Sequence, residues 1–400
     1  MKNIGYLKNR ILDYSWGSRT FIPKLMGASS PAKEPCAELW LGSHPKAPSL
    51  VEVNGKWVPI SDIIKEDPIA VLGEAVARRF ENQLPFLLKI LAAQKPLSIQ
   101  AHPNREQAVD GFNRENRMGV SLNSPRRNYR DENHKPELLC ALTPFWALKG
   151  FRERMELEAL LGSIAFFDIA ETVFKERLSK YDLPSFFAAI LSADRKKQTI
   201  LVKEVVNAAE KAGGQCPPLS WVIALDRSFP GDIGVLAPLV LNLIQLEPGE
   251  AIFVSAGELH AYLKGAAIEV MANSDNVLRG GLTSKHVDVQ QLLKIVQFKE
   301  NCQQPIKLVK GEDGAGVYPT YADEFVLSKI EIEEGLSFHS LEKRNVEILI
   351  MVEGEATITD LGSLGILRLP QGASVLVPAA VLKYLITGNG KIYRASVPQE

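Results

Sequence analysis

Residues 97–104 read Leu-Ser-Ile-Gln-Ala-His-Pro-Asn, a strand pattern that contains the two side chains on which the chemistry depends, Gln100 and His102. Gln100 and His102 are two residues apart, and alternate side chains of a β-strand leave the same face. An amide oxygen and an imidazole nitrogen therefore project side by side, as neutral ligands that suit zinc or a similar divalent ion. Because unpartnered buried polar groups are costly, the pair indicates either a metal site or a satisfied polar network.

Two distant segments offer the remaining ligands. Glu137 lies in the strand pattern of residues 135–142, where Lys135 shares its face, so a carboxylate and a cation would enter the cavity together. His260 lies much further along the chain and offers a second imidazole. The hypothesis is one metal site with four ligands, built from distant strands of a single barrel.

Glu106 competes with Glu137 for the carboxylate position. Gln100-x-His102-x-x-x-Glu106 imitates the H-x-H-x-x-x-E pattern of cupin metal proteins. A short helix is expected to begin after Asn104, its N-cap, and this helix turns Glu106 away from the strand face. We therefore prefer Glu137 as the third ligand.

The bulk composition is that of an ordinary globular protein. The chain has 400 residues, of which 46% are hydrophobic and 23% charged, and this length favours two or three domains. A formal net charge of -1 gives no electrostatic footprint for nucleic acid or for an anionic membrane. Any anionic substrate must therefore be bound by a few placed cations.

The sequence also predicts the compartment. The first residues show no secretory leader, and no run of about 18 apolar residues predicts a membrane span. The four cysteines are scattered without a C-x-x-C pair, which argues against thiolate-bound zinc. We expect a cytoplasmic protein with reduced thiols.

The hydrophobic pattern changes along the chain. Short strand signals dominate up to residue 151, among them a hairpin at 51–58 with an Asn-Gly turn. Residues 152–238 lose the alternation, show helical spacing and contain no metal or nucleophile pattern. Strand signals resume after residue 238, so the sequence predicts a helical insert between strand-rich regions.

A weak internal repeat relates residues 246–260 to residues 369–383. In that register His260 falls opposite Lys383, so the C-terminal copy has the barrel pattern but lacks the ligand. Chance similarity between two turn-and-strand units is the alternative.

A polar segment at residues 267–286 follows His260 closely. Glu269 lies in its strand portion, and the chain then becomes polar up to Arg279 and Lys285. Taken alone the segment is typical of a solvated loop. Beside a metal site, the two cations would bring fixed positive charge to an anionic substrate.

Together these segments resemble the type I mannose-6-phosphate isomerase (phosphomannose isomerase) family over essentially the whole chain. The matching stretches are Glu38–Pro45, Leu97–Asn104, Asn133–Leu142, Gly249–Gly265 and Ala267–Asp288. The resemblance implies one zinc ion per chain, held by Gln100, His102, Glu137 and His260.

The resemblance also implies the fold class, which is mainly β with a helical insert. Two cupin-like jelly-roll barrels and an α-helical domain are expected. The catalytic barrel would comprise residues 1–151 and 239–315, the inserted helical domain residues 152–238, and a second jelly roll without metal ligands residues 316–400.

The implied reaction interconverts mannose 6-phosphate and fructose 6-phosphate through a cis-enediol(ate). Such a carbon acid needs its developing oxyanion stabilised and a base within reach, and a divalent metal acts as Lewis acid. Arg279 is the residue expected to stabilise the enediolate, and Lys135 helps with the same charge or shuttles the proton. Glu269, Lys135 and a metal-bound water all stay open as the base.

The remaining site residues are assigned on the same resemblance. His44 assists opening of the sugar ring or is a structural histidine before a proline turn. Lys89, Ser98 and Lys285 are the candidates for binding the substrate phosphate.

Two other functions compete with the isomerase. A cupin metal oxygenase is disfavoured by the glutamine ligand, since iron oxygen chemistry usually uses histidine-rich or two-histidine-one-carboxylate sites. A non-catalytic sugar-phosphate-binding double cupin does not explain why all four ligands occur with Arg279 and Lys285. A small sugar phosphate is the only partner expected, and the sequence is compatible with a monomer without fixing the oligomeric state.

Overall fold

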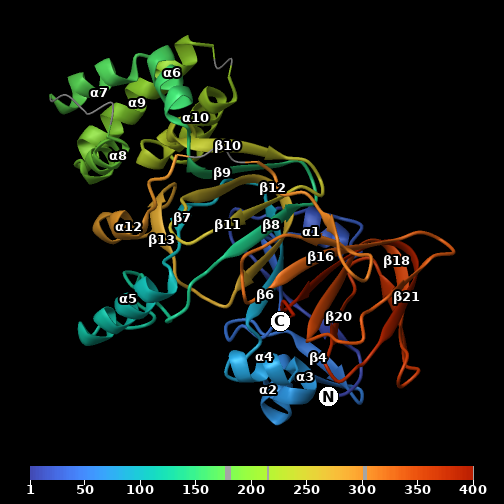
Figure 1. Cartoon of the computed structure of the whole chain (residues 1–400). Coiled ribbons are helices and arrows are strands. Elements are labelled where there is room, and N and C mark those ends of the chain that lie inside the picture. The colour runs from blue at the N-terminus through green and yellow to red at the C-terminus, as the bar shows by residue number, and fades with distance from the viewer. Residues whose placement is uncertain (176–181, 214–215, 301–303, 400) are drawn as a thin grey trace.

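The structure is a computed structural model that describes residues 1–175, 182–213, 216–300 and 304–399. The chain forms a β-rich fold of two antiparallel sheets joined to a segment of helices (Figure 1). The helical segment lies at one end, the strand-rich middle carries the site, and the C-terminal strands lie at the other end.

The first sheet, of ten strands, is organised around β12 (His260–Ala272). The first part of β12 pairs with β9 and β7, and its last part pairs with β6 and β8. Because one strand changes partners along its length, the sheet curls and one of its faces becomes concave. The other strands are β2 (Arg10–Leu12), β3 (Glu38–Leu41), β6 (Phe86–Ala93), β7 (Ile99–Ala101), β8 (Glu137–Ala141), β9 (Phe145–Phe151), β10 (Leu241–Leu246), β11 (Ala251–Val254) and β13 (Leu278–Gly281).

The second sheet, of eleven strands, joins both ends of the chain. Gly5 of β1 pairs with Leu376 of β20, so the N-terminal strand is hydrogen-bonded among C-terminal ones. The predicted hairpin is confirmed as β4 and β5, which pair across an Asn-Gly turn. The strands are β1 (Gly5–Lys8), β4 (Leu50–Val53), β5 (Lys56–Pro59), β14 (Val309–Lys310), β15 (Gly316–Tyr318), β16 (Val326–Ile332), β17 (Ser337–His339), β18 (Glu347–Asp360), β19 (Ile366–Pro370), β20 (Ser374–Val377) and β21 (Tyr384–Ser396).

A run of helices connects β9 to β10, where the sequence predicts helical spacing. It consists of α6 (Arg154–Ser163), α7 (Phe166–Phe174), α8 (Leu183–Ser192), α9 (Arg195–Lys211), α10 (Pro217–Ser228), the 3-10 helix η1 (Ile233–Leu236) and α11 (Ala237–Val240). Buried aliphatic and aromatic side chains of this run share one hydrophobic core with β7, β9 and β12. The helices therefore cover one end of the sheet that carries the candidate ligands.

The other helices are α1 (Phe21–Leu25), α2 (Ile60–Glu66), α3 (Pro68–Leu72), α4 (Glu74–Arg79), α5 (Arg105–Arg117) and α12 (Val289–Ile295). Asn104 is the N-cap of α5, as predicted, and forms a capping box with Gln107. The expectation of a short helix here is wrong, because α5 has 13 residues. Ala108, Gly111 and Glu115, spaced by three and four residues, give it a buried face that sustains the extra turns.

One hydrophobic core joins the two sheets. Leu88 and Ile90 of β6 pack with residues of β16, β18 and β21 on this shared core. Leu87 and Lys89 alternate with them and point to the opposite, concave face. The shared core thus fixes which side chains of the first sheet are available to the site.

The repeated sequence segments have the same order of elements. Strands β10, β11 and β12 correspond to β19, β20 and β21, and each third strand has 13 residues. Gly249 and Gly372 occupy matched turns with φ of 93° and 83°, a conformation that glycine adopts without strain. Lys383, opposite His260 in the repeat, pairs with Glu342 at the surface.

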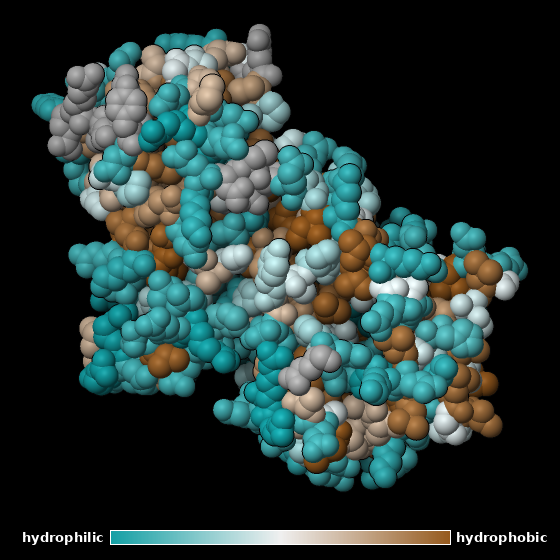
Figure 2. Space-filling model, in the orientation of Figure 1, coloured by the Kyte–Doolittle hydropathy of each residue, from teal (hydrophilic) through white to brown (hydrophobic). Residues whose placement is uncertain are grey.

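The visible face of the molecule is largely hydrophilic, with smaller hydrophobic areas between the polar ones (Figure 2). Across the described ranges, the helices are too short or too polar to cross a membrane.

Candidate metal centre

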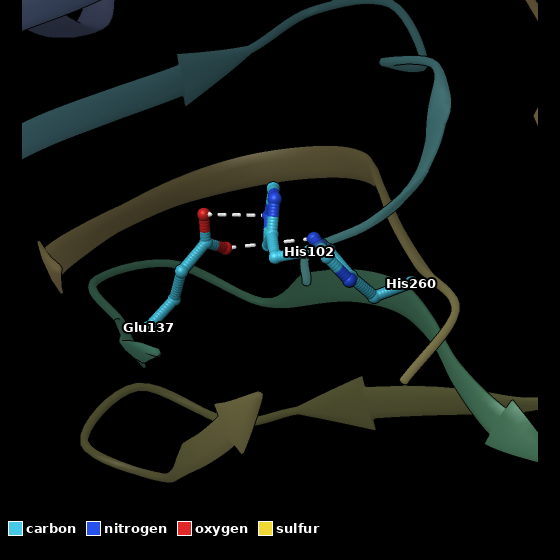
Figure 3. A group of neighbouring side chains, drawn as sticks. All are labelled: His102, Glu137 and His260. Atoms are coloured by element: carbon cyan, nitrogen blue, oxygen red, sulfur yellow. Dashed lines mark ion pairs between the residues drawn. The ribbon is translucent and has the colours of Figure 1, made fainter. Parts of the chain in front are cut away.

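Three predicted ligands converge at one end of the first sheet. His102 directly follows β7, Glu137 begins β8 and His260 begins β12. One ligand atom from each residue lies within 4.8 Å of the other two, and all three side chains are buried. The Glu137 carboxylate faces both imidazoles, with Oε1 3.2 Å from His102 Nε2 and Oε2 3.5 Å from His260 Nε2 (Figure 3).

Backbone carbonyls fix the tautomer of both imidazoles. His102 Nδ1 lies 2.7 Å from the Asn276 carbonyl, and His260 Nδ1 lies 3.0 Å from the Glu258 carbonyl. Since a carbonyl only accepts, each Nδ1 carries the proton and donates it. Burial lowers the pKa of His102 to about 4 and lowers that of His260, so both rings are neutral at pH 7. Each Nε2 therefore carries a lone pair that can bind a metal ion.

The donor set at this centre fits a divalent cation. Two imidazole lone pairs face a carboxylate, and His102 Nε2 is buried without a hydrogen bond from any residue in the described ranges. Burial raises the pKa of Glu137, but the Lys135 ammonium 2.7 Å away outweighs burial and holds it well below its usual range. Converging buried acceptors repel one another unless a positive charge lies between them.

Gln100 is aligned with the centre by strand register. In adjacent strands Gln100 of β7 pairs with His260 of β12 and with Arg279 of β13. Directly opposed residues of antiparallel strands share a face, so these side chains lie in one row. The Gln100 amide nitrogen donates to Ser98 Oγ at 3.3 Å, which leaves the amide oxygen for another partner. Glu106, the competing ligand, is exposed in the first turn of α5.

A polar cavity of about 760 Å³ opens on the concave face beside the centre. Predicted residues that line it are His44, Lys89, Ser98, Gln100, Lys135, Arg279 and Lys285. Lys135 links the two features, because it lines the cavity and contacts Glu137. Of the catalytic candidates, Glu269 is buried and does not line the cavity itself, but its partner Lys89 does.

Lys89 and Glu269 form a buried ion pair. Lys89 Nζ lies 2.9 Å from Glu269 Oε2 and 3.9 Å from Glu38 Oε2, and it lies 5.4 Å from the Trp40 ring centre. Although burial lowers the pKa of Lys89, the two carboxylates outweigh it and raise that pKa, so Lys89 stays an ammonium. The Glu269 and Glu38 carboxylates thus offset the positive charge of Lys89, which is predicted to bind phosphate.

Arg279 and Lys285 form an electropositive wall of the cavity. Burial, followed by the Arg130 charge, lowers the pKa of Arg279. Burial, followed by Arg279, lowers that of Lys285. Neither cation has a carboxylate within ion-pair distance among the residues that the structure describes. Neighbouring cations without carboxylate partners are suited to bind an anion.

His44 also lines the cavity. Its Nδ1 accepts from the Lys46 amide at 3.3 Å, so the proton of the neutral ring is on Nε2, 3.6 Å from Asp275 Oδ1. Burial lowers the pKa of His44 to about 4 although Asp275 acts in the opposite direction. At pH 7 His44 is therefore a neutral imidazole with a proton on Nε2.

Several residues of the site were not found by sequence reasoning. The Tyr262 hydroxyl donates to Glu137 Oε2 at 2.9 Å, and its position two residues after His260 is a signal that was available. Asp232, in the helical run, accepts from the amides of Gly234 and Leu282 at 2.8 Å and so fixes the chain leading to Lys285. No local pattern predicts a contact across 50 residues.

The buried imidazoles predict how the stability of the metal-free protein depends on pH. His102 has a pKa of about 4 when folded against 6.5 unfolded, so between these values only the unfolded chain binds the proton. Stability should therefore fall as pH falls from 6.5 to 4, with about 3 kcal/mol due to His102.

The measurement is the free energy of unfolding against pH, with chelator present. Between pH 6.5 and pH 4, the free energy of unfolding of His102→Gln should fall by about 3 kcal/mol less than that of the parent. Identical slopes for the two proteins would contradict a buried neutral His102.

Comparisons with known proteins agree with this geometry. Residues 4–154 match the family model described as phosphomannose isomerase type I, catalytic domain. Mannose-6-phosphate isomerase of Escherichia coli strain K12 is 38% identical over 390 residues, 97% of this chain and 98% of the relative. The human mannose-6-phosphate isomerase is 33% identical over 375 residues, 86% of each chain.

Solved structures are similar over nearly the whole length. A crystal structure of a phosphomannose isomerase mutant from Salmonella typhimurium has a TM-score of 0.91 and 36% identity, covering 99% of this chain and 100% of that one. A zinc-bound crystal structure of mannose 6-phosphate isomerase has a TM-score of 0.90, 36% identity and the same coverage.

Proposed function

The chain belongs to the type I phosphomannose isomerase family, and we propose that it interconverts mannose 6-phosphate and fructose 6-phosphate. The observation that carries this function is the convergence of His102, Glu137 and His260 beside a cavity with an electropositive wall. A zinc-bound relative of the same fold supports zinc as the ion, one per chain.

Gln100, His102, Glu137 and His260 would hold the zinc ion. The two Nε2 atoms of His102 and His260 and the Glu137 carboxylate lie close together in the structure. Strand register aligns the Gln100 amide with them. When bound, zinc supplies Lewis-acid stabilisation of the substrate oxygen on which negative charge develops.

The neighbouring side chains handle charge and protons during the transfer between C2 and C1. Arg279 lies in the row of Gln100 and His260, where a guanidinium stabilises the enediolate oxygens. The Lys135 ammonium lines the cavity and would neutralise the same charge or return a proton to oxygen. Glu269 is the carboxylate proposed as base: burial raises its pKa above the ordinary value, while the ion pair with Lys89 acts in the opposite direction.

The rest of the substrate is bound along the cavity. His44 presents its Nε2 proton on one side, as ring opening requires. Ser98 and Lys285 lie near Gln100 and Arg279 in the lining and are proposed to bind phosphate. Lys89 also lines the cavity, but its two carboxylate partners reduce its charge toward the ligand, so we assign Lys285 the larger share.

Lys285→Ala is expected to raise KM for mannose 6-phosphate by about 10–100-fold with little change in kcat, since it removes one charged hydrogen bond to a non-reacting group. Steady-state kinetics measure both constants, and Lys383→Ala, at a surface lysine that pairs with Glu342, is the matched control. A kcat loss with unchanged KM would place Lys285 at the reacting atoms instead.

We infer that the two sheets are two cupin-type jelly-roll barrels with an inserted helical domain, and that the enzyme is cytoplasmic. The curled first sheet, the repeated strand order and the helices between β9 and β10 support this architecture. The limits at residues 151, 238 and 315 stay predictions, and β1 pairs with the sheet of the C-terminal strands.

The function is tested by incubating the purified full chain, loaded with zinc, with mannose 6-phosphate and measuring fructose 6-phosphate. Turnover with the phosphorylated sugar and a large loss with free mannose is the expected result. Oxygen uptake in place of isomerisation would favour the cupin oxygenase. Binding of the sugar phosphate without interconversion would favour the non-catalytic double cupin.

A further inference from the structure

We propose that Asn276 is the positioning residue of the metal centre. Its side chain holds the loop that leads to Glu137, while its backbone carbonyl holds the imidazole of His102. One buried residue thereby sets the separation of two metal ligands. This inference rests on the proposed zinc site.

The Asn276 side chain is fully buried and uses its whole hydrogen-bonding capacity on one loop. Its Oδ1 accepts from the amides of Arg130 and Asp131 at 2.6 and 3.2 Å. Its Nδ2 donates to the carbonyls of Asp131 and Asn133, both at 2.8 Å. The loop so held continues directly into Lys135 and Glu137.

The Asp131 side chain adds hydrogen bonds between the same two segments, from the loop at 130–133 to residues 274–276. Its Oδ1 accepts from Ser274 Oγ at 2.8 Å and from Asn276 Nδ2 at 3.1 Å. Its Oδ2 accepts from the Asp275 amide at 2.7 Å. Residues 274–276 are therefore attached to the loop at 130–133 through both side chains and backbone.

Strand pairing alone does not fix the distance between His102 and Glu137. In the described strands β7 pairs with β12 and β13, whereas β8 pairs with β11 and β12. The strand that leads to His102 and the strand that begins with Glu137 are therefore not hydrogen-bonded to each other. The Asn276 carbonyl accepts the Nδ1 proton of His102 at 2.7 Å, while the side chain holds the loop before Glu137. Groups that orient metal ligands in this way tune metal affinity.

Asn276→Asp keeps the shape but replaces the two donors of Nδ2 by an oxygen facing two carbonyls and the Asp131 carboxylate. The zinc dissociation constant, measured by competition with a chromogenic chelator, is expected to rise by about 10–100-fold. With cobalt at saturation, the visible absorption of the variant should differ from that of the parent, because the ligand geometry has changed. A change in overall stability alone would not alter that spectrum.

Gln198→Glu is the matched control. Gln198 is a buried amide of the helical run whose Nε2 donates to the carbonyls of Ile190 and Leu191 at 3.2 and 3.0 Å. The Gln198→Glu variant should be less stable than the parent, with unchanged zinc affinity and an unchanged cobalt spectrum. If Asn276→Asp does not fold, Asp131→Asn takes its place with the same expectation.

Parental zinc affinity and an unchanged cobalt spectrum in the variant would overturn the positioning role. Equal weakening of zinc binding in Gln198→Glu would also overturn it, because affinity would then follow general stability. A parent chain that binds no zinc would instead refute the proposed metal site itself, so the two failures are distinguishable.

Discussion

Replacing Glu137 by glutamine is expected to abolish stoichiometric zinc binding and to lower turnover by about 10³-fold or more, because the charge-stabilising ion is lost. The carboxylate is the only anionic group among the three converging ligands, and it lies 3.2 and 3.5 Å from the two imidazoles. Glutamine has the same shape, but its amide carries no charge and offers donors to lone pairs that would otherwise bind the metal.

The fold of Glu137→Gln should survive, since an amide can donate to one imidazole and accept from Lys135. Thermal unfolding with and without zinc provides the readout. Zinc at a hundred times its dissociation constant should stabilise the parent by about 2.7 kcal/mol and leave the variant unchanged.

Glu347→Gln is the control for loss of a buried carboxylate. Glu347 is buried in the second sheet and pairs with Arg344 at 3.4 Å and Arg394 at 3.6 Å. It should lose stability and keep zinc binding. Normal zinc binding and turnover in Glu137→Gln would contradict the assignment of Glu137 as a ligand.

Arg279→Ala is expected to lower kcat by about 10³-fold while zinc binding and fold are retained, since it removes a group that stabilises the charge of the enediolate. Arg279 lies across from Gln100 in the neighbouring strand and lines the cavity. Its guanidinium has no carboxylate partner in the described part of the chain, so its removal exposes no buried counter-charge.

Arg279→Lys should recover part of the loss, because it keeps the charge without the planar fork. Steady-state kinetics and the zinc content of each variant are the measurements. Arg368→Ala, at an exposed arginine paired with Glu355 in the second sheet, should behave as the parent. Near-normal kcat in Arg279→Ala would show that another group stabilises the enediolate.

Local sequence patterns predicted the parts of the site that depend on strand periodicity. The same-face placement of Gln100 and His102 stays a prediction from strand alternation. Lys135 and Glu137, two residues apart, do come together, with Lys135 Nζ 2.7 Å from Glu137 Oε1. The N-cap at Asn104 turned Glu106 to the surface, where it is found. These features follow from backbone geometry within a few residues, so a single sequence contains them.

Contacts between distant segments were not predictable in this way. Asn276 bonds to Asp131 across 145 residues, and its polar neighbourhood was indistinguishable from that of a solvated loop. The pairing of Gly5 with Leu376 has no local signal either, because β1 reads like any short strand. Lys89 was one of the candidates for binding phosphate, and no local pattern indicated that Glu269, 180 residues away, pairs with it.

The most direct test of a zinc-dependent isomerase is a titration of the metal-free chain with zinc while the formation of fructose 6-phosphate is followed. The account predicts no turnover without metal, a linear rise with added zinc and a plateau at one zinc per chain. Full turnover in protein shown to contain no divalent metal would contradict the account.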